Sequence, residues 1–223
     1  MLHIIKELKA MQRRNRVRKG PNASALAAIM RNNALFIHIP KCGGKSIIHD
    51  IYGLAQHDHF GHATIRYYKA LLGPRRFEDV FRFALVRDPI ERAVSGYNFY
   101  KAGGFGGPNS QLRIYKDAIS FDQFVADGHL EERSRVDVVF RPQSHFLTDH
   151  DGCLATDRVY DFADFDAAIC DIRTKCGMPQ LDQTSKINIT PHKHTTQIIP
   201  QTARKVRTIY QVDYDNFGQI CAW

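Results

Sequence analysis

Two short apolar runs along the chain are each followed by a polar turn and then by an amphipathic segment. The first run covers residues 35–39 and stops at Pro40, and the second covers residues 81–86 and stops at Arg87. Apolar runs of this length, bounded by turn residues, are typical of buried strands, and the segments after them have helical spacing. The repeated order of strand, loop and helix predicts a three-layer α/β fold with a central, mainly parallel sheet.

The rest of the pattern predicts further elements and a simple domain organisation. We expect a helix over 121–125 capped by Ser120, a strand over 158–162, a helix over 165–176 ended by Gly177, and a terminal helix over 201–220 with Thr202 near its start. Residues 102–108 are too rich in glycine for a regular element and predict a loop, which either gates a site or only connects two elements. Because no internal repeat divides the chain, we expect a basic helical leader over residues 1–30 and one domain over residues 31–223.

The positive charge of the chain is concentrated in that leader. The formal net charge is +8, and residues 6–19 hold seven lysines and arginines against the single Glu7. Leu2, Ile5, Leu8 and Met11 recur at helical spacing, which favours a basic amphipathic helix. Such a helix either lies on an anionic membrane or acidic polymer, or forms a solvated leader packed on the domain.

The turn after the first apolar run has the composition of an anion-binding loop. Gly43 and Gly44 let backbone N–H groups approach an anion, the next helix adds the positive end of its dipole, and Lys41 and Lys45 add mobile charge. The end of the nucleoside-triphosphate pattern GxxxxGK[ST] is matched, but Ile39 stands where that pattern has its first glycine. The turn therefore predicts a site for a phosphate-like group that need not belong to ATP.

The turn after the second run has features of a second anion site. Asp88 is a natural N-cap and Pro89 a natural first residue of a helix, so Arg87 falls at the end of the strand. Arg87 and Ser95 are candidates to converge on one phosphate. Arg92 either contributes to that site or pairs with Asp88 at i,i+4 on the helix surface.

Two motifs carry a family resemblance. The segments IPKCGGKSI and RDPIERAVSGY resemble the 5'-phosphosulfate loop and the 3'-phosphate motif of sulfotransferases that use 3'-phosphoadenosine-5'-phosphosulfate (PAPS). The similarity is to the carbohydrate branch, which contains heparan 2-O-sulfotransferases, chondroitin sulfotransferases and short bacterial members. It implies a P-loop-like fold and transfer of a sulfuryl group to a hydroxyl of a carbohydrate or glycolipid, without a metal ion.

The resemblance also implies roles for single residues. Lys41 would contact the bridging oxygen of the donor, and His62, in the segment over 60–72, would be the catalytic base. An unperturbed imidazole titrates close to pH 6.5, so His62 suits that role. The donor would be bound by Lys41, Cys42, Gly43, Gly44, Lys45, Ser46, Ile47, Arg87 and Ser95, and Ser185, Lys186 and Asn188 resemble a region that approaches the donor in relatives.

Composition bounds the remaining possibilities. A hydrophobic content of 43% and a charged content of 24% fit one folded enzyme domain. No apolar run is long enough to span a membrane, no signal peptide is evident, and the five cysteines show no disulfide pattern, so we expect a cytoplasmic protein. Cys42 would be a small residue of the loop rather than a reactive thiolate.

Three alternatives stay open at this point. His57, Asp58, His59 and His62 are close enough in sequence to imitate a metal site, although they lack the spacing of common metal motifs. A nucleotide kinase would share the glycine-rich loop, and a basic nucleic-acid-binding module would share the charged leader. We expect no metal and no nucleic acid, and the sequence predicts neither the acceptor nor the oligomeric state.

Overall fold

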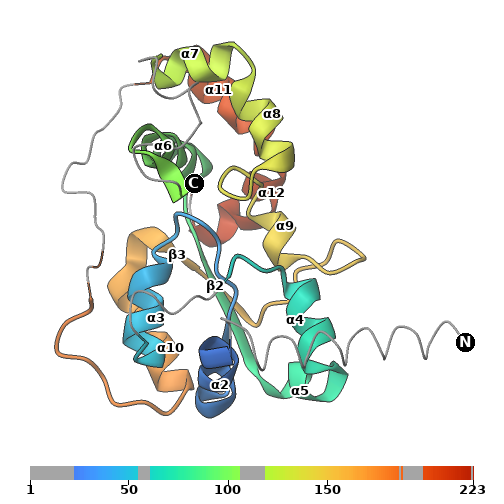
Figure 1. The fold of residues 1–223 in the computed structure, drawn as a ribbon, viewed down its shortest axis with the longest axis vertical. Helices are drawn as coiled ribbons and strands as arrows, with labels where there is room; N and C mark the ends of the chain where they lie inside the picture. The colour runs from blue at the N-terminus through green and yellow to red at the C-terminus, as the bar shows by residue number, and fades with distance from the viewer. Residues whose placement is uncertain (1–22, 55–60, 106–118, 186, 188–197, 222) are drawn as a thin grey trace, which may run out of the picture. The chain divides into compact units, whose positions relative to one another are not determined.

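The computed structural model describes residues 23–54, 61–105, 119–185, 187, 198–221 and 223, and its helices and strands are labelled in Figure 1. In chain order the elements are α2 (Ala23–Asn32), β1 (Ala34–Phe36), α3 (Gly44–Tyr52), α4 (Ile65–Leu72), α5 (Pro74–Asp79), β2 (Phe81–Val86), α6 (Pro89–Lys101), α7 (Phe121–Ala126), α8 (His129–Val136), α9 (Ser144–Leu147), β3 (Arg158–Asp161), the 3₁₀ helix η3 (Phe162–Asp164), α10 (Phe165–Lys175), α11 (Pro200–Ile209) and α12 (Gln211–Cys221).

The chain forms two compact units. The sheet unit consists of Met1–Ile39, Gly43–Val86 and His145–Ile189, and the helical unit consists of Pro40–Cys42, Arg87–Ser144 and Thr190–Trp223. The predicted boundary between leader and domain, at residue 30, falls within α2. The division into a leader and one domain stays a prediction.

The sheet unit contains a parallel three-stranded sheet in the order β1-β2-β3. The central strand β2 is buried from Phe83 to Val86, as expected for a strand with a neighbour on each edge. Helix α2 packs on β1, while α10 packs on β3 and on α3. In Figure 1, α3 and α10 lie on one side of the strands, and α4 and α5 lie on the other. The predicted α/β class with a parallel sheet is confirmed.

The first strand is shorter than its apolar run. β1 ends at Phe36, and the N–H of Ile37 makes one further bond to the carbonyl of Phe83, at 2.9 Å. The last residues of the run leave the sheet because the chain turns at Pro40 and Lys41. The apolar run therefore predicted burial correctly but not the length of the strand.

The start of β3 is fixed to β2 by one carboxylate. Asp157 accepts hydrogen bonds from the backbone N–H of Arg82 at 2.7 Å and from its guanidinium at 2.6 and 3.0 Å. The backbone N–H of Asp157 donates to the carbonyl of Arg82 at 2.8 Å. Burial would raise the pKa of Asp157, but the hydrogen bonds and charge of Arg82 outweigh it and hold that pKa below its usual value.

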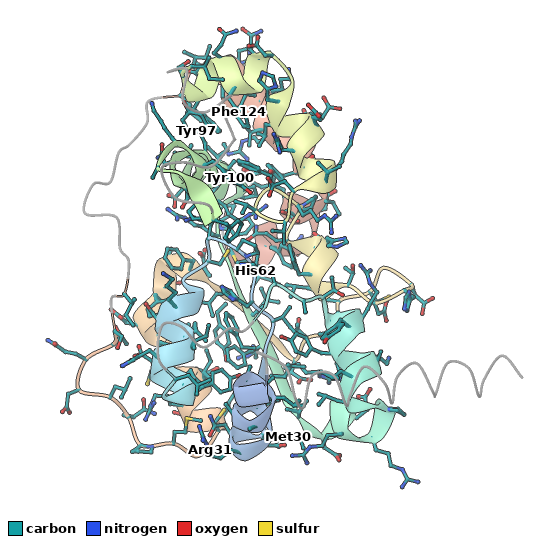
Figure 2. All side chains as sticks on the ribbon, viewed as in Figure 1. Met30, Arg31, His62, Tyr97, Tyr100 and Phe124 are labelled. Carbon is teal, nitrogen blue, oxygen red and sulfur yellow. The ribbon has the colours of Figure 1, made fainter. Side chains whose placement is uncertain are left out.

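The helical unit is built around one aromatic core. Tyr97 and Tyr100 of α6 and Phe124 of α7 gather among its helices (Figure 2). Helix α11 packs on both α6 and α7, and contributes the fully buried Val206. The predicted starts of α6 and α7 are confirmed, because the N-caps Asp88 and Ser120 accept the N–H of Glu91 and Gln123, respectively, at 3.0 and 3.1 Å.

The prediction of one terminal helix over 201–220 was wrong. Helix α11 ends at Ile209 and α12 begins at Gln211, with Tyr210 between them at φ −108° and ψ 24°. Tyr210 is fully buried, and its hydroxyl donates to the carbonyl of Phe140 at 2.7 Å. The break follows from this long-range contact, which the helical spacing of the sequence does not show.

The basic leader lies outside the part of the chain that the structure describes, up to residue 22. Its amphipathic helix therefore stays a prediction. Among the helices that are described, none has both the length and the apolar character needed to cross a bilayer.

We predict that Asp157→Asn destabilises the protein in a pH-dependent way. Since an amide accepts fewer of the Arg82 donors and carries no charge, the free energy of unfolding should fall by about 1–2 kcal/mol at neutral pH. A carboxylate with a lowered folded-state pKa stabilises the fold above its unfolded pKa of about 3.9, and this contribution is lost as pH falls through the folded value. Urea unfolding at several pH values should show the difference between the two proteins shrinking as the pH falls below the unfolded value of about 3.9.

Asp151→Asn, at an exposed turn, is the matched control and should leave the free energy of unfolding unchanged within about 0.5 kcal/mol. A difference between wild type and Asp157→Asn that is constant with pH would contradict the role assigned to the charge.

Candidate active site

The anion loop, residues 40–47, turns sharply before α3. Gly43 has φ 76° and is the N-cap of α3, which begins at Gly44. The N–H groups of Ser46 and Ile47 both point back to the carbonyl of Gly43, at 3.1 and 3.3 Å. Since a glycine N-cap has no side chain that could accept the first amides of the helix, the start of α3 is suited to an anion.

Both loop glycines are required by close contacts within the sheet unit. A Cβ at Gly43 would lie 2.7 Å from the ring of Phe162, and a Cβ at Gly44 would lie 1.9 Å from Nε2 of His38. Real Cβ atoms do not approach other atoms this closely. We predicted that the glycines here give an anion access to the backbone. The structure adds a second reason, since aromatic rings occupy the space that a side chain at either position would need.

His62, which is labelled in Figure 2, lies against His38. Its Nδ1 is 3.2 Å from the carbonyl oxygen of His38, and the two imidazole centroids are 4.3 Å apart. A carbonyl oxygen can only accept, so Nδ1 of a neutral His62 carries the proton and Nε2 carries the lone pair. This is the tautomer that a general base acting through Nε2 requires.

The segment around Ser185 runs along α3 toward the anion loop. The N–H of Ser185 donates to the buried carboxylate of Asp50 at 2.7 Å, and its hydroxyl contacts Nδ1 of His49 at 2.8 Å. One turn closer to the loop, the N–H of Ile187 donates to the hydroxyl of Ser46 at 3.1 Å. Ser185 therefore contacts the second half of α3, whereas Lys186 and Asn188 lie outside the described residues.

A surface cavity of about 430 Å³ lies beside this segment. Its lining includes Asp50, Tyr52, Arg173 and Ser185, so it lies at the last turns of α3. The anion loop is at the other end of the same helix, and the cavity is therefore a separate feature.

Two of the predicted lysines differ in their surroundings. Lys45 is exposed on the first turn of α3. Lys41 has a left-handed backbone at φ 69°, which is uncommon for a residue with a side chain and is often found at functional sites. Within the helical unit, its ammonium lies 4.5 Å from the centroid of the Phe99 ring, a cation–π contact.

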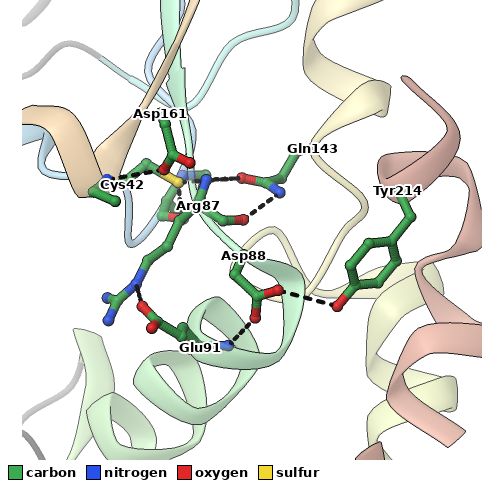
Figure 3. A network of polar contacts seen from close by, with 9 residues as sticks. Cys42, Arg87, Asp88, Glu91, Gln143, Asp161 and Tyr214 are labelled. Atoms are coloured by element: carbon green, nitrogen blue, oxygen red, sulfur yellow. Dashed lines mark hydrogen bonds and ion pairs between the residues drawn. The ribbon is translucent and has the colours of Figure 1, made fainter. Parts of the chain in front are cut away.

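Gln143 organises the part of the site that belongs to the helical unit (Figure 3). Its Oε1 accepts the N–H of Arg87 at 2.9 Å, and its Nε2 donates to the carbonyl of Arg87 at 2.9 Å. The same Oε1 accepts from the thiol of Cys42 at 3.4 Å. One fully buried amide therefore binds the backbone after β2 and a residue of the anion loop.

Gln143 is itself held from the C-terminal helix. The N–H groups of Gln143 and Ser144 donate to the two oxygens of Asp213, both at 2.8 Å. Asp213 is fully buried and also accepts the hydroxyl of Ser144 at 2.5 Å. Three donors on one carboxylate make this a rigid anchor for Gln143.

Cys42 is a neutral thiol, in line with its predicted role as a small residue. Burial raises its pKa to about 12, although the charges of Arg92, Arg87 and Lys41 act in the opposite direction. A protonated thiol can donate to Gln143, and it adds no negative charge to the anion loop.

The side chains around the second motif divide into surface and core. The Nε of Arg87 donates to Glu91 at 3.1 Å, an i,i+4 pair whose carboxylate is 64% exposed. Ser95 lies two turns into α6 and is half-buried. Arg92 is buried and donates to the carbonyls of Val139 and Arg141 at 2.9 and 2.6 Å. We predicted that Arg92 would contact a phosphate or pair with Asp88. Its guanidinium instead binds these two carbonyls.

Sequence reasoning did not identify His38 or Gln143 as site residues. His38 had a signal, since it is a polar residue inside an apolar run. Gln143 lies 56 residues from Arg87 in the chain, so no local spacing indicates their contact.

The histidine cluster is only partly described. His57, Asp58 and His59 lie outside the described residues. Within the described ranges, no three His, Cys, Asp or Glu side chains are grouped as metal ligands would be. The metal alternative therefore stays untested.

Comparison with known proteins identifies the family. A sequence model of the sulfotransferase family matches residues 28–218, which includes the anion loop, His62, Arg87 and Gln143. No curated protein and no solved structure matches the chain. The match covers most of the sequence, and the chain therefore belongs to the sulfotransferase family.

Proposed function

We propose that this sulfotransferase moves the sulfuryl group of PAPS to a hydroxyl of a carbohydrate or glycoconjugate, with His62 as the general base. The observation that carries the proposal is the contact of His62 Nδ1 with the carbonyl of His38, at 3.2 Å. It gives a neutral His62 its basic nitrogen at Nε2, and the ring of His38 lies against Gly44 of the anion loop. Sulfuryl transfer to a hydroxyl requires a positioned base and donors for the developing negative charge, and His38 contacts the residues proposed for both roles.

The sheet supports the proposal that both motifs bind one donor. β1 and β2 are adjacent and parallel, so the chain leaves both strands at the same edge of the sheet. The anion loop follows β1, and Arg87 follows β2 directly. We assign the 5'-phosphosulfate to the loop, with Cys42, Gly43, Gly44, Lys45, Ser46 and Ile47 around it, and the 3'-phosphate to Arg87 and Ser95.

The chemistry assigned to the residues follows from these places. PAPS supplies an activated sulfuryl group on a phosphate leaving group. Lys41 neutralises charge on the bridging oxygen, the first amides of α3 bind the equatorial oxygens, and Nε2 of His62 removes the acceptor proton. These roles need no metal ion.

The acceptor class and the location are proposed from the sequence. A carbohydrate or glycolipid acceptor comes from the resemblance of the two motifs to the carbohydrate branch.

We further propose a cytoplasmic protein whose basic leader contacts an anionic membrane surface, because seven of the cations fall within residues 6–19. Liposome sedimentation with and without residues 1–20 tests that contact, and equal sedimentation would contradict it.

Donor recognition predicts a selective response to the 3'-phosphate. At about 100 times its dissociation constant, 3'-phosphoadenosine-5'-phosphate should stabilise the protein by about 2.7 kcal/mol, whereas ADP and ATP should add much less. Thermal unfolding with each nucleotide measures the difference. A response to ATP and magnesium alone would instead support a kinase, and a shift caused by nucleic acid alone would support a nucleic-acid-binding module.

His62→Ala should lower kcat by about 10²–10⁴-fold, because one positioned base contributes about that factor. The dissociation constant for 3'-phosphoadenosine-5'-phosphate should stay within about 2-fold, since the imidazole acts on the acceptor and not on the nucleotide. Transfer of labelled sulfate to a hydroxyl acceptor, together with calorimetric titration, measures both. His150→Ala, at an exposed turn, is the control, and equal turnover in His62→Ala would remove His62 from the reaction.

Arg87→Ala should remove the discrimination between nucleotides. Loss of a charge-assisted contact to the 3'-phosphate should weaken binding of 3'-phosphoadenosine-5'-phosphate by about 10–100-fold and leave the weak binding of ADP unchanged. Arg135→Ala removes a comparable surface pair with Glu131 and should change neither. An equal loss of affinity for both nucleotides would show that Arg87 supports the fold and not the 3'-phosphate.

A further inference from the structure

The ring of His38 contacts both the anion loop and His62. A Cβ at Gly44 would lie 1.9 Å from its Nε2 and 2.3 Å from its Cδ2. Its ring centroid is 4.3 Å from that of His62, at an interplanar angle of 54°. All three residues belong to the sheet unit. One imidazole thus touches the first residue of α3 and His62.

The ring of His38 is held in place by an aromatic row on the sheet. It stacks on Phe36 at 5.4 Å and 23°, and Phe36 stacks on Phe83 at 5.4 Å and 24°. Phe36 and Phe83 are paired residues of β1 and β2 and are fully buried. A ring stacked on the rigid centre of a sheet is a fixed support and not a mobile side chain.

We propose that His38 is a positioning residue of sulfuryl transfer, and that its ring sets the separation between the anion loop and His62. The proposal rests on the role proposed above for His62. A base acts only within hydrogen-bond reach of the proton it removes, about 2.6–3.2 Å, and a misplacement of about 1 Å costs about 10²-fold in rate. The ring of His38 provides this spacing by its volume, while its carbonyl fixes the tautomer of His62.

The His38 ring occupies the space that a side chain at position 44 would need, and position 44 is a glycine. Gly44 is not among the described glycines with a positive φ, so its backbone would accept alanine. The three heavy atoms nearest to a Cβ at this position all belong to the His38 ring. His38 and Gly44 are therefore a matched pair, and their substitutions should not be additive.

The first experiment measures this pair through stability alone. Gly44→Ala should lower Tm by about 5 °C in the wild-type background, because a methyl group is forced against a supported ring. In the His38→Ala background the same substitution should change Tm by less than about 1 °C. Gly218→Ala is the control, since Gly218 is helical with nothing within 4 Å of its Cβ position, and it should not lower Tm.

The second experiment separates positioning from donor binding. His38→Ala should lower kcat by about 10²-fold while the KM for PAPS stays within about 3-fold. His38→Phe keeps a ring at this place and should restore kcat to within about 5-fold of wild type. A chemical role for the imidazole would instead leave His38→Phe as inactive as His38→Ala, which would overturn the proposal.

The outcomes distinguish this proposal from the proposed function. If Gly44→Ala lowers Tm equally in both backgrounds, His38 and Gly44 are not a matched pair and the proposal fails. If the wild-type protein neither binds 3'-phosphoadenosine-5'-phosphate nor transfers sulfate, the proposed function fails. The Tm measurements would still report the pairing in that case, because they involve no ligand.

Discussion

The parallel pairing of β1 with β2 is the interaction on which the candidate site depends. Ala34 to Phe36 pair in register with Phe81 to Phe83, and Ile37 adds one further hydrogen bond to Phe83. This register directs the chain out of both strands at one edge of the sheet. The anion loop and the Arg87 segment are separated by about 40 residues of sequence, yet each begins within a few residues of that edge. Without this pairing, the two segments would no longer start from the ends of neighbouring strands.

The anion loop is shaped by contacts that leave it without negative charge. Burial keeps Cys42 protonated, so the thiol donates to Gln143 and does not compete with a bound anion. Because Gly43 and Gly44 have no side chains, the rings of Phe162 and His38 can pack against them. Lys41 has a left-handed backbone, which is uncommon for a residue with a side chain. A conformation of this kind costs about 1–3 kcal/mol and persists only where the surroundings impose it. Within the helical unit, the ammonium of Lys41 lies over the Phe99 ring, and the next residue, Cys42, is held by Gln143.

Local signals in the sequence predicted the elements that local interactions form. Asp88 and Pro89 start α6, Ser120 caps α7, and the apolar run over 81–86 is the central strand. The glycine-rich turn likewise predicted the turn that precedes α3. These features depend on residues a few positions apart, which is the range over which patterns in a sequence are informative.

The features that the sequence did not show depend on contacts between distant segments. Tyr210 breaks the terminal helix because its hydroxyl reaches Phe140, and Gln143 binds Arg87 across 56 residues. The contact between the His38 ring and Gly44 likewise appears only in the folded structure. The polar His38 stands out in its apolar run, but residue type and spacing do not show which residues His38 and Gln143 contact.

The distribution of arginines bears on how the second motif can bind an anion. Arg92 was a candidate for this role, but it is 1% exposed and its guanidinium donates to two backbone carbonyls. Of the two arginines in this motif, Arg87 is therefore the one that we propose for the 3'-phosphate. Its contact with Glu91 is a surface pair, worth about 0–1 kcal/mol, whereas a phosphate offers a guanidinium stronger, bidentate hydrogen bonds. The carboxylate of Glu91 is 64% exposed, so it stays hydrated whether or not it contacts Arg87.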